Sequence, residues 1–241
     1  MKTLSKADDT PYSKEHLAAM GLAAAVLAHE IANELNVVRC AVEEAEAELS
    51  EQHKEDGISS ALHEAKSGIE RLCSLLQQFR NLARPQKLRL QPTDLTSVVN
   101  DLLAAEKVRY TAQGIHVEVD FGRNLPRLML DVEKFRQALL NLCTNAAEAM
   151  PEGGTLKVRA HSSKSSVSLE ISDTGVGIPA GVDVFALFAT TKPQGTGLGL
   201  AIVRQIISAH GGSVTYSSRP GTGTVFRLML PLRSTGSTFV A

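Results

Sequence analysis

Two runs of apolar or small residues in the first third of the chain recur at alternating steps of four and three positions. The first run is Leu17, Gly21, Ala24, Ala28, Ile31, Leu35, Val38, Val42, Ala45 and Leu49. The second run is Ile58, Leu62, Ala65, Ile69, Leu72, Leu76, Phe79 and Ala83. Such spacing puts each run on one side of an α-helix, as in a coiled coil or helical bundle. Gly57, between the runs, can end the first helix, so the repeat predicts a helical hairpin.

The predicted hairpin has a broad apolar face that two helices alone cannot bury. A C2 homodimer is the simplest way to cover it, so we expect a dimeric four-helix bundle. His29 lies one residue past Ala28, beside this face and partly exposed. Glu30 follows it, and Asn33 lies four residues further along, on the same side of the helix. Taken alone, these three side chains favour a polar cluster on the surface of a charged helix.

Composition excludes several functional classes. A net charge of -1, an aromatic content of 4% and the absence of Trp argue against a nucleic-acid-binding or membrane-surface protein. No apolar run approaches the roughly 20 residues that span a bilayer, and the first residues lack the apolar centre of a signal peptide. Cys40, Cys73 and Cys143 are widely spaced, so we expect reduced, packed thiols. These features predict a soluble, cytoplasmic protein.

From Pro92 onward the pattern changes to mixed helices and strands. Asp94 and Asp131 each precede an apolar periodic stretch, as helix N-caps do. Three helices are predicted: one from the Asp94 cap to about residue 112, one over 131–150 and one over 199–210. The predicted strands are 115–121, 155–161, 165–172, 213–217 and 224–230. In the first strand the alternating apolar residues are Ile115, Val117, Val119 and Phe121. Strands gathered with helices on one side predict an α/β sandwich.

Two asparagines in the predicted helix 131–150 indicate a metal and phosphate site. Asn141 and Asn145 are four residues apart, so both carboxamides point the same way. Their oxygens suit Mg²⁺, which takes hard oxygen ligands and brings phosphates with it. A pair of exposed polar residues is the alternative, but the apolar neighbours favour a buried helix, where unpaired amides are costly. These neighbours are Leu140, Leu142, Cys143 and Ala146.

Two glycine-rich motifs follow. Asp173, at the end of a strand, precedes Gly175 and Gly177, which allow close backbone approach, and its carboxylate can accept a hydrogen bond from an adenine amino group. Taken alone, an ordinary β-turn explains this motif equally well. The second motif, Gly195-Thr-Gly-Leu-Gly199, leads directly into a helix, where free N–H groups favour phosphate. Neither the dinucleotide fingerprint nor the P-loop signature accompanies it.

The order and spacing of these motifs resemble the H, N, G1 and G2 boxes of sensor histidine kinases. The matching segments are Ala28–Asn33, Asn141–Asn145, Asp173–Gly177 and Gly195–Gly199. The resemblance covers about residues 14 to 232 and looks closest to the soluble nitrogen-regulation type. It implies a flexible N-terminus (1–13), a dimerisation and histidine-phosphotransfer domain (14–88), a GHKL-type catalytic ATP-binding domain (89–232) and a flexible tail (233–241).

The resemblance also implies a role for each motif. His29 would receive the γ-phosphate of ATP and pass it to an aspartate of a response regulator receiver domain. Glu30 would orient the imidazole, and Asn33 would orient water if the protein also dephosphorylates its partner. Asn145, with Asn141, would hold Mg²⁺, and Asp173 would read adenine. The remaining residues expected to contact the nucleotide are Gly175, Gly177, Thr191, Lys192, Gly195, Thr196, Gly197, Leu198 and Gly199.

Two departures from the family pattern carry expectations of their own. Glu34 stands where many relatives have Pro, so we expect the first helix to run straight past His29. The segment between Pro179 and Gly195 is short, and we expect it to form a mobile lid over ATP. Alternatives to the kinase are a dimeric scaffold that binds nucleotide without transfer, a phosphatase-dominant member, and an ATPase that hydrolyses ATP to water. Asn141 disfavours the last, because such enzymes usually carry a basic Glu at that position.

Overall fold

The computed structural model describes residues 31, 33, 35–45, 47, 62–69, 72, 88–190 and 196–232. The chain divides into two compact units, Met1–Pro85 and Gln86–Ala241. Within the described residues, none of the helices combines the length and the apolar character needed to cross a membrane.

The described residues of the first unit are helical, as the apolar repeat predicts. The residues of this unit that are buried within one chain are small, and they include Ala41, Ala45 and Ala65. Four large apolar side chains of the repeat are exposed: Leu35 54%, Val42 41%, Leu62 57% and Ile69 50%. One chain therefore leaves part of the apolar face uncovered.

The cysteines differ in environment. Cys143 is buried and free, and burial raises the pKa of its thiol to about 12, so it packs as a neutral group, as predicted. Cys40 is free but exposed, so the predicted packing of that thiol is wrong. It lies outside the apolar repeat, between Val38 and Val42. Cys73 lies outside the described residues.

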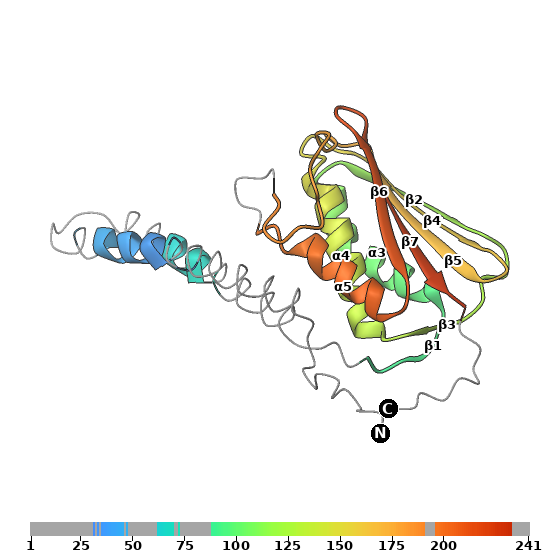
Figure 1. The fold of residues 1–241 in the computed structure, drawn as a ribbon. Coiled ribbons are helices and arrows are strands. Elements are labelled where there is room, and N and C mark those ends of the chain that lie inside the picture. The colour runs from blue at the N-terminus through green and yellow to red at the C-terminus, as the bar shows by residue number, and fades with distance from the viewer. Residues whose placement is uncertain are drawn as a thin grey trace, which may run out of the picture. The chain divides into compact units, whose positions relative to one another are not determined.

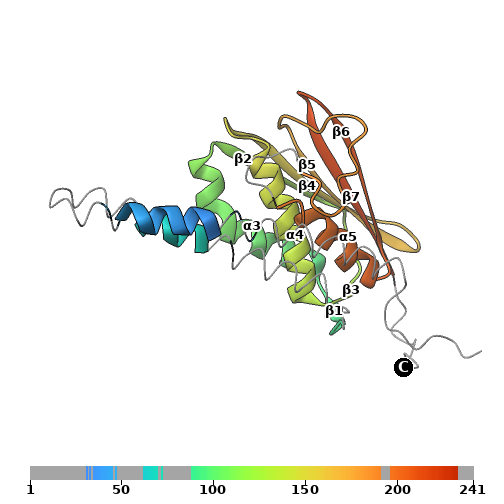
Figure 2. The same ribbon diagram turned by 60° about the vertical axis from the view of Figure 1, so that its left-hand side comes forward.

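The second unit is an α/β sandwich, as predicted. Its elements are β1 (Gln91–Thr93), α3 (Leu95–Ala112), β2 (Ile115–Phe121), β3 (Leu128–Leu130), α4 (Val132–Glu148), β4 (Gly154–Ser162), β5 (Ser166–Asp173), α5 (Gly199–Ala209), β6 (Ser213–Arg219) and β7 (Gly223–Pro231). Five strands form one sheet in the order β2-β4-β5-β7-β6. The β2–β4 pair is parallel and the other pairs are antiparallel. Figures 1 and 2 show α3, α4 and α5 together on one side of this sheet.

The predicted helix starts are confirmed. Asp94 caps α3 by accepting a hydrogen bond from the Thr96 amide (2.8 Å), and Asp131 caps α4 by accepting one from the Lys134 amide (3.1 Å). The sequence reasoning missed β1 and β3, which pair with each other as a separate two-stranded sheet. Each has only three residues, too few to show an alternating pattern.

The core lies between the helices and one face of the sheet. Leu156, Val158 and Ala160 alternate along β4 and are at most 1% exposed. Val119 shares their face in the β2–β4 register. It belongs to the apolar face as predicted, but it is 42% exposed and is not part of the buried core. The reason is that β2 is an edge strand of the sheet.

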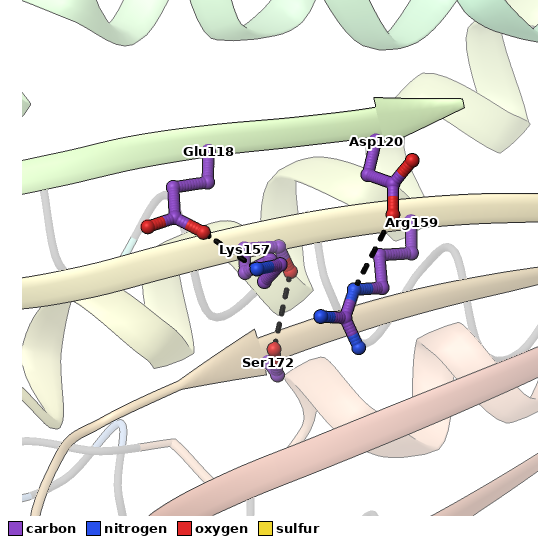
Figure 3. Close-up of polar contacts among 5 residues, drawn as sticks. All are labelled: Glu118, Asp120, Lys157, Arg159 and Ser172. Atoms are coloured by element: carbon purple, nitrogen blue, oxygen red, sulfur yellow. Dashed lines mark hydrogen bonds and ion pairs between the residues drawn. The ribbon is translucent and has the colours of Figure 1, made fainter.

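The opposite face of the sheet is polar (Figure 3). Lys157 lies 2.6 Å from Glu118 on β2, and Arg159 lies 3.7 Å from Asp120. The Ser172 hydroxyl on β5 donates to the Lys157 carbonyl at 3.3 Å. The charged groups neutralise one another across neighbouring strands, as on a solvated sheet face.

Candidate nucleotide site

The two predicted metal-binding asparagines lie on α4, one turn apart and both half-buried. The Asn141 amide nitrogen donates to the Gly199 carbonyl at 3.1 Å. Because its nitrogen is engaged in this way, the side-chain oxygen of Asn141 is the atom that remains to bind a cation. The structure thus joins the first asparagine of the N-box segment to the first residue of α5.

The N-terminus of α5 can receive an anion. Leu198, at the N-cap position, is buried and makes no side-chain capping hydrogen bond, so the first amides of the helix are left for another acceptor. A Cβ atom placed on Gly199 would have the Asn141 amide group, at 3.9 Å, as its nearest neighbour. The protein itself therefore leaves room here, and uncapped amides with a positive helix dipole suit phosphate oxygens.

Gly197 is a glycine for a different reason. Its φ is +63°, and a Cβ atom there would lie 2.3 Å from the Phe188 carbonyl carbon. The Phe188 amide also donates to the Gly197 carbonyl at 3.0 Å. Glycine is therefore needed at position 197 because of this backbone contact, and not because a ligand needs room there.

Asp173 ends β5 with its side chain buried and oriented. Its Oδ1 accepts hydrogen bonds from the backbone amides of Gly175 (2.9 Å) and Thr224 (3.2 Å). Thr224 is its partner in the β5–β7 register. Two donors at one oxygen fix the carboxylate plane, so the group can accept a hydrogen bond from a planar donor such as an adenine amino group.

The turn after Asp173 packs so closely against neighbouring backbone that two of its residues have no room for a side chain. A Cβ atom on Gly175 would lie 2.4 Å from the Ala149 carbonyl oxygen at the end of α4. One on Gly177, whose φ is +71°, would lie 2.3 Å from the Arg219 carbonyl oxygen. Only glycine fits at either position, so the turn that carries Asp173 has a single defined position.

The structure describes part of the predicted site. Asn141, Asn145, Asp173, Gly175, Gly177, Thr196, Gly197, Leu198 and Gly199 all belong to the second unit. Asn33 is helical and exposed in the first unit. The predicted residues outside the described ones are His29, Glu30, Thr191, Lys192 and Gly195; Glu34 is outside them as well.

The sequence did not lead us to one residue that supports the site, Thr224. Thr224 is 4% exposed and supplies an amide to Asp173; a polar residue on the apolar side of the strand, in step with Phe226 and Leu228, was the available signal. In the segment predicted to form a lid, Val184 and Phe185 are buried (5% and 8% exposed), and the Phe185 ring packs against Phe226 on β7. The mobility of this segment stays a prediction.

The second unit matches a known ATPase family. Residues 130–234 match the family described as "Histidine kinase-, DNA gyrase B-, and HSP90-like ATPase". This range contains Asn141, Asn145, Asp173 and both glycine-rich motifs.

Individual relatives extend the match toward the N-terminus. The sensor histidine kinase ZraS of Escherichia coli K12 is 34% identical over 227 residues, which cover 92% of this chain and 48% of ZraS. The chain thus spans about half the length of this curated relative. The structure of the mycobacterial sensor histidine kinase MprB is 33% identical, with a TM-score of 0.53, covering 60% of this chain and 98% of that one.

A third similarity concerns the fold alone. The histidine kinase ThkA, solved in complex with the response regulator protein TrrA, is 22% identical with a TM-score of 0.78. The alignment covers 91% of this chain and 64% of the ThkA complex chain.

Proposed function

Because the chain belongs to the sensor histidine kinases, we propose that it transfers the γ-phosphate of ATP to its own His29 and then to an aspartate of a response regulator. The Asn141–Gly199 hydrogen bond carries the proposal. This hydrogen bond holds the Asn141 side chain, whose oxygen can bind a cation, beside an uncapped helix N-terminus that can bind phosphate oxygens.

Asn141 and Asn145 would hold Mg²⁺ through their side-chain oxygens, and the cation would neutralise phosphate charge. The α5 amides from Gly199 onward, with Thr196, Gly197 and Leu198, would bind the phosphates. Asp173, with Gly175 and Gly177 allowing close approach, would accept the adenine amino hydrogen. Thr191, Lys192 and Gly195 stay predictions for the phosphate end.

His29 would act as the nucleophile. Its Nε2 forms the new bond to phosphorus while the bond from phosphorus to the bridging oxygen breaks, and ADP leaves with that electron pair. Glu30 would accept a hydrogen bond from Nδ1–H and so raise the basicity of Nε2. Positioning and charge neutralisation supply the rate, because phosphoryl transfer needs little other chemistry from the protein.

A homodimer forms part of the proposal. Leu35 and Val42 are seven residues apart, as are Leu62 and Ile69, and all four are exposed in one chain. Large apolar residues at a heptad spacing are the residues that a second helical pair buries. A second copy of the hairpin, related by a two-fold axis, would complete a four-helix bundle.

A response regulator receiver domain is the proposed partner. ThkA, which shares this fold, was solved with a response regulator. Asn33 is exposed on its helix, where its amide can orient water to remove phosphate from such a partner. A cytoplasmic location, where ATP is at hand, belongs to the same proposal.

Incubating the chain with γ-labelled ATP and Mg²⁺ tests the proposal. We expect an acid-labile, base-stable phosphoprotein that His29→Ala abolishes and His63→Ala retains. His63 is a matched control because it is an exposed histidine on a helix of the same unit. Label that persists in His29→Ala overturns the assignment of the nucleophile.

Dephosphorylation of the response regulator tests the role proposed for Asn33. Asn33→Ala should slow the loss of phosphate from a phosphorylated receiver domain while autophosphorylation stays unchanged. Nucleotide binding without label on any histidine would favour the scaffold alternative instead.

A further inference from the structure

The chain that follows the Asp173 turn packs against side chains of β6, the strand at one edge of the main sheet. β6 is the last strand in the sheet order, so its outer edge lacks a strand partner among the described residues. Residues 176–185, the edge segment, contact β6 and the turn after it. The Gly221 amide donates to the Val176 carbonyl (2.8 Å) and the Ile178 amide donates to the Ser218 hydroxyl (2.8 Å).

Tyr216, on β6, holds the far end of this segment. Its hydroxyl donates to the Val182 carbonyl at 2.8 Å. Its ring meets the Phe185 ring edge to face, with centroids 5.9 Å apart and planes at 76°, a favourable arrangement for aromatic pairs. Tyr216 therefore contacts the edge segment through a polar group and an apolar one.

Phe185 is enclosed from further sides. Its ring lies 6.4 Å from the Phe226 ring on β7, and Arg204 of α5 stands over it at 5.7 Å. This cation–π contact links the edge segment to the helix whose N-terminus is the proposed phosphate site. Three residues beyond Phe185, the Phe188 amide donates to the Gly197 carbonyl at 3.0 Å.

The described contacts thus run from Tyr216 to the start of α5. Val182 and Phe185 are fixed on β6, Phe188 is fixed to Gly197, and Gly199 begins the helix. Phe188 has a positive φ of 62°, and its backbone lies so close to Gly197 that position 197 has no room for a side chain. The two residues therefore accept little relative movement.

We propose that Tyr216 is a positioning residue for the phosphate end of the nucleotide site, through its hydrogen bond to Val182 and its ring contact with Phe185. The proposal rests on the proposed function, namely that α5 binds ATP phosphates. Asp173 depends on other contacts, the amides of Gly175 and Thr224. Tyr216 should therefore affect the phosphate end and spare the adenine end.

Tyr216→Phe removes only the hydroxyl and keeps the ring. By calorimetric titration of the full chain with Mg·ATP, we expect the affinity to fall about three- to tenfold, the effect of losing one hydrogen bond to a part-buried carbonyl. The affinity for adenosine, which lacks phosphate, should not change. Tyr110→Phe is the matched control, since it removes a buried tyrosine hydroxyl on α3 and should leave both affinities unchanged.

Amide hydrogen exchange gives a second readout that does not depend on activity. Peptides that cover the Ala186 and Phe188 amides should exchange faster in Tyr216→Phe than in wild type, and those that cover α3 should not. Equal losses of ATP and adenosine affinity would show general destabilisation and overturn the proposal. Unchanged ATP affinity with unchanged exchange would overturn it too.

The outcomes for this proposal and for the proposed function are separable. A wild-type chain that binds Mg·ATP but never labels His29 contradicts the kinase and leaves the Tyr216 test valid. A wild-type chain that does not bind Mg·ATP removes the premise of both.

Discussion

The two glycine-rich turns of the nucleotide site contrast in what makes them glycine-rich. In the Asp173 turn (residues 173–177), Gly175 and Gly177 have neighbouring carbonyl oxygens within 2.4 Å of where a Cβ would lie. In the Gly197 turn (residues 196–199), Gly197 is equally restricted, but Gly199 has nothing nearer than 3.9 Å. Neighbouring protein atoms therefore fill the space around the glycines of the Asp173 turn, whereas space remains beside Gly199, the last residue of the Gly197 turn.

This difference indicates how the two ends recognise a nucleotide. A rigid carboxylate at Asp173 can select one planar base by its hydrogen-bonding edge. An open helix N-terminus accepts phosphate oxygens, which any nucleotide triphosphate carries. On the proposed function, we expect the Asp173 turn to select the base and the open turn to supply the affinity for phosphate.

The largest effect, a loss of folding stability, is expected from Gly175→Ala, which adds a methyl group in the preformed Asp173 turn. The added methyl group must displace the Ala149 carbonyl at the end of α4, and such overpacking costs about 3 kcal/mol. Urea unfolding without nucleotide measures it. Gly181→Ala is the control: Gly181 has a positive φ (83°) but no neighbour within 4 Å, so this variant should lose only about 1 kcal/mol, from the backbone conformation alone. Equal losses would contradict the steric argument.

Asp173→Asn should affect binding rather than folding. The amide oxygen can still accept from the Gly175 and Thr224 amides, which turns the NH₂ group toward the base. A donor would then face the donor of an adenine amino group, and the affinity for ATP should fall about tenfold or more. Calorimetry with ATP and GTP checks this. ATP binding at wild-type strength would show that Asp173 does not contact adenine.

The starts of α3 and α4 and the spacing of the two asparagines were predictable because they depend on local sequence. Asp94 and Asp131 cap helices through amides two or three residues away, and the asparagine spacing on α4 follows from helical periodicity. Long-range contacts were not predictable. Thr224 reaches Asp173 across 51 positions, and Phe185 meets Tyr216, which lies 31 positions further along the chain.

Gly199→Ala tests the open turn and should leave the fold intact. The methyl group meets nothing closer than the Asn141 amide at 3.9 Å, and alanine is the better helix former, so the unfolding midpoint should stay unchanged or rise slightly. Affinity for Mg·ATP should fall about three- to tenfold, because the methyl group occupies space beside the proposed cation ligand. A loss of stability like that of Gly175→Ala would remove the contrast between the two turns.

The smallest effect is expected at Asp131, at the other end of α4 from Asn145. Burial opposes its ionisation, but hydrogen bonds from the Arg89 and Lys134 amides hold the pKa of its carboxyl below the ordinary value. A lowered pKa means that the folded chain binds this proton less readily than the unfolded chain. The charged group therefore stabilises the fold above about pH 4, the unfolded value, and that contribution is lost as the pH falls through the folded value.

Asp131→Asn removes that charge and keeps the cap, because the asparagine oxygen can still accept from the Lys134 amide. Its NH₂ group replaces the oxygen that accepts from the Arg89 amide, so only the pH-dependent part of the difference in stability reports the charge. The wild type should be more stable than the variant at pH 6, by about 1 kcal/mol or less, and the difference should shrink by pH 3. Urea midpoints at the two pH values measure it. The backbone amide of Asp131, which donates to His210 Nε2 at 3.0 Å, is retained in both proteins. Since neither turn loses a contact, ATP and adenosine affinities at pH 7 should match wild type; a selective loss of ATP affinity would mean that the open turn depends on the far end of α4.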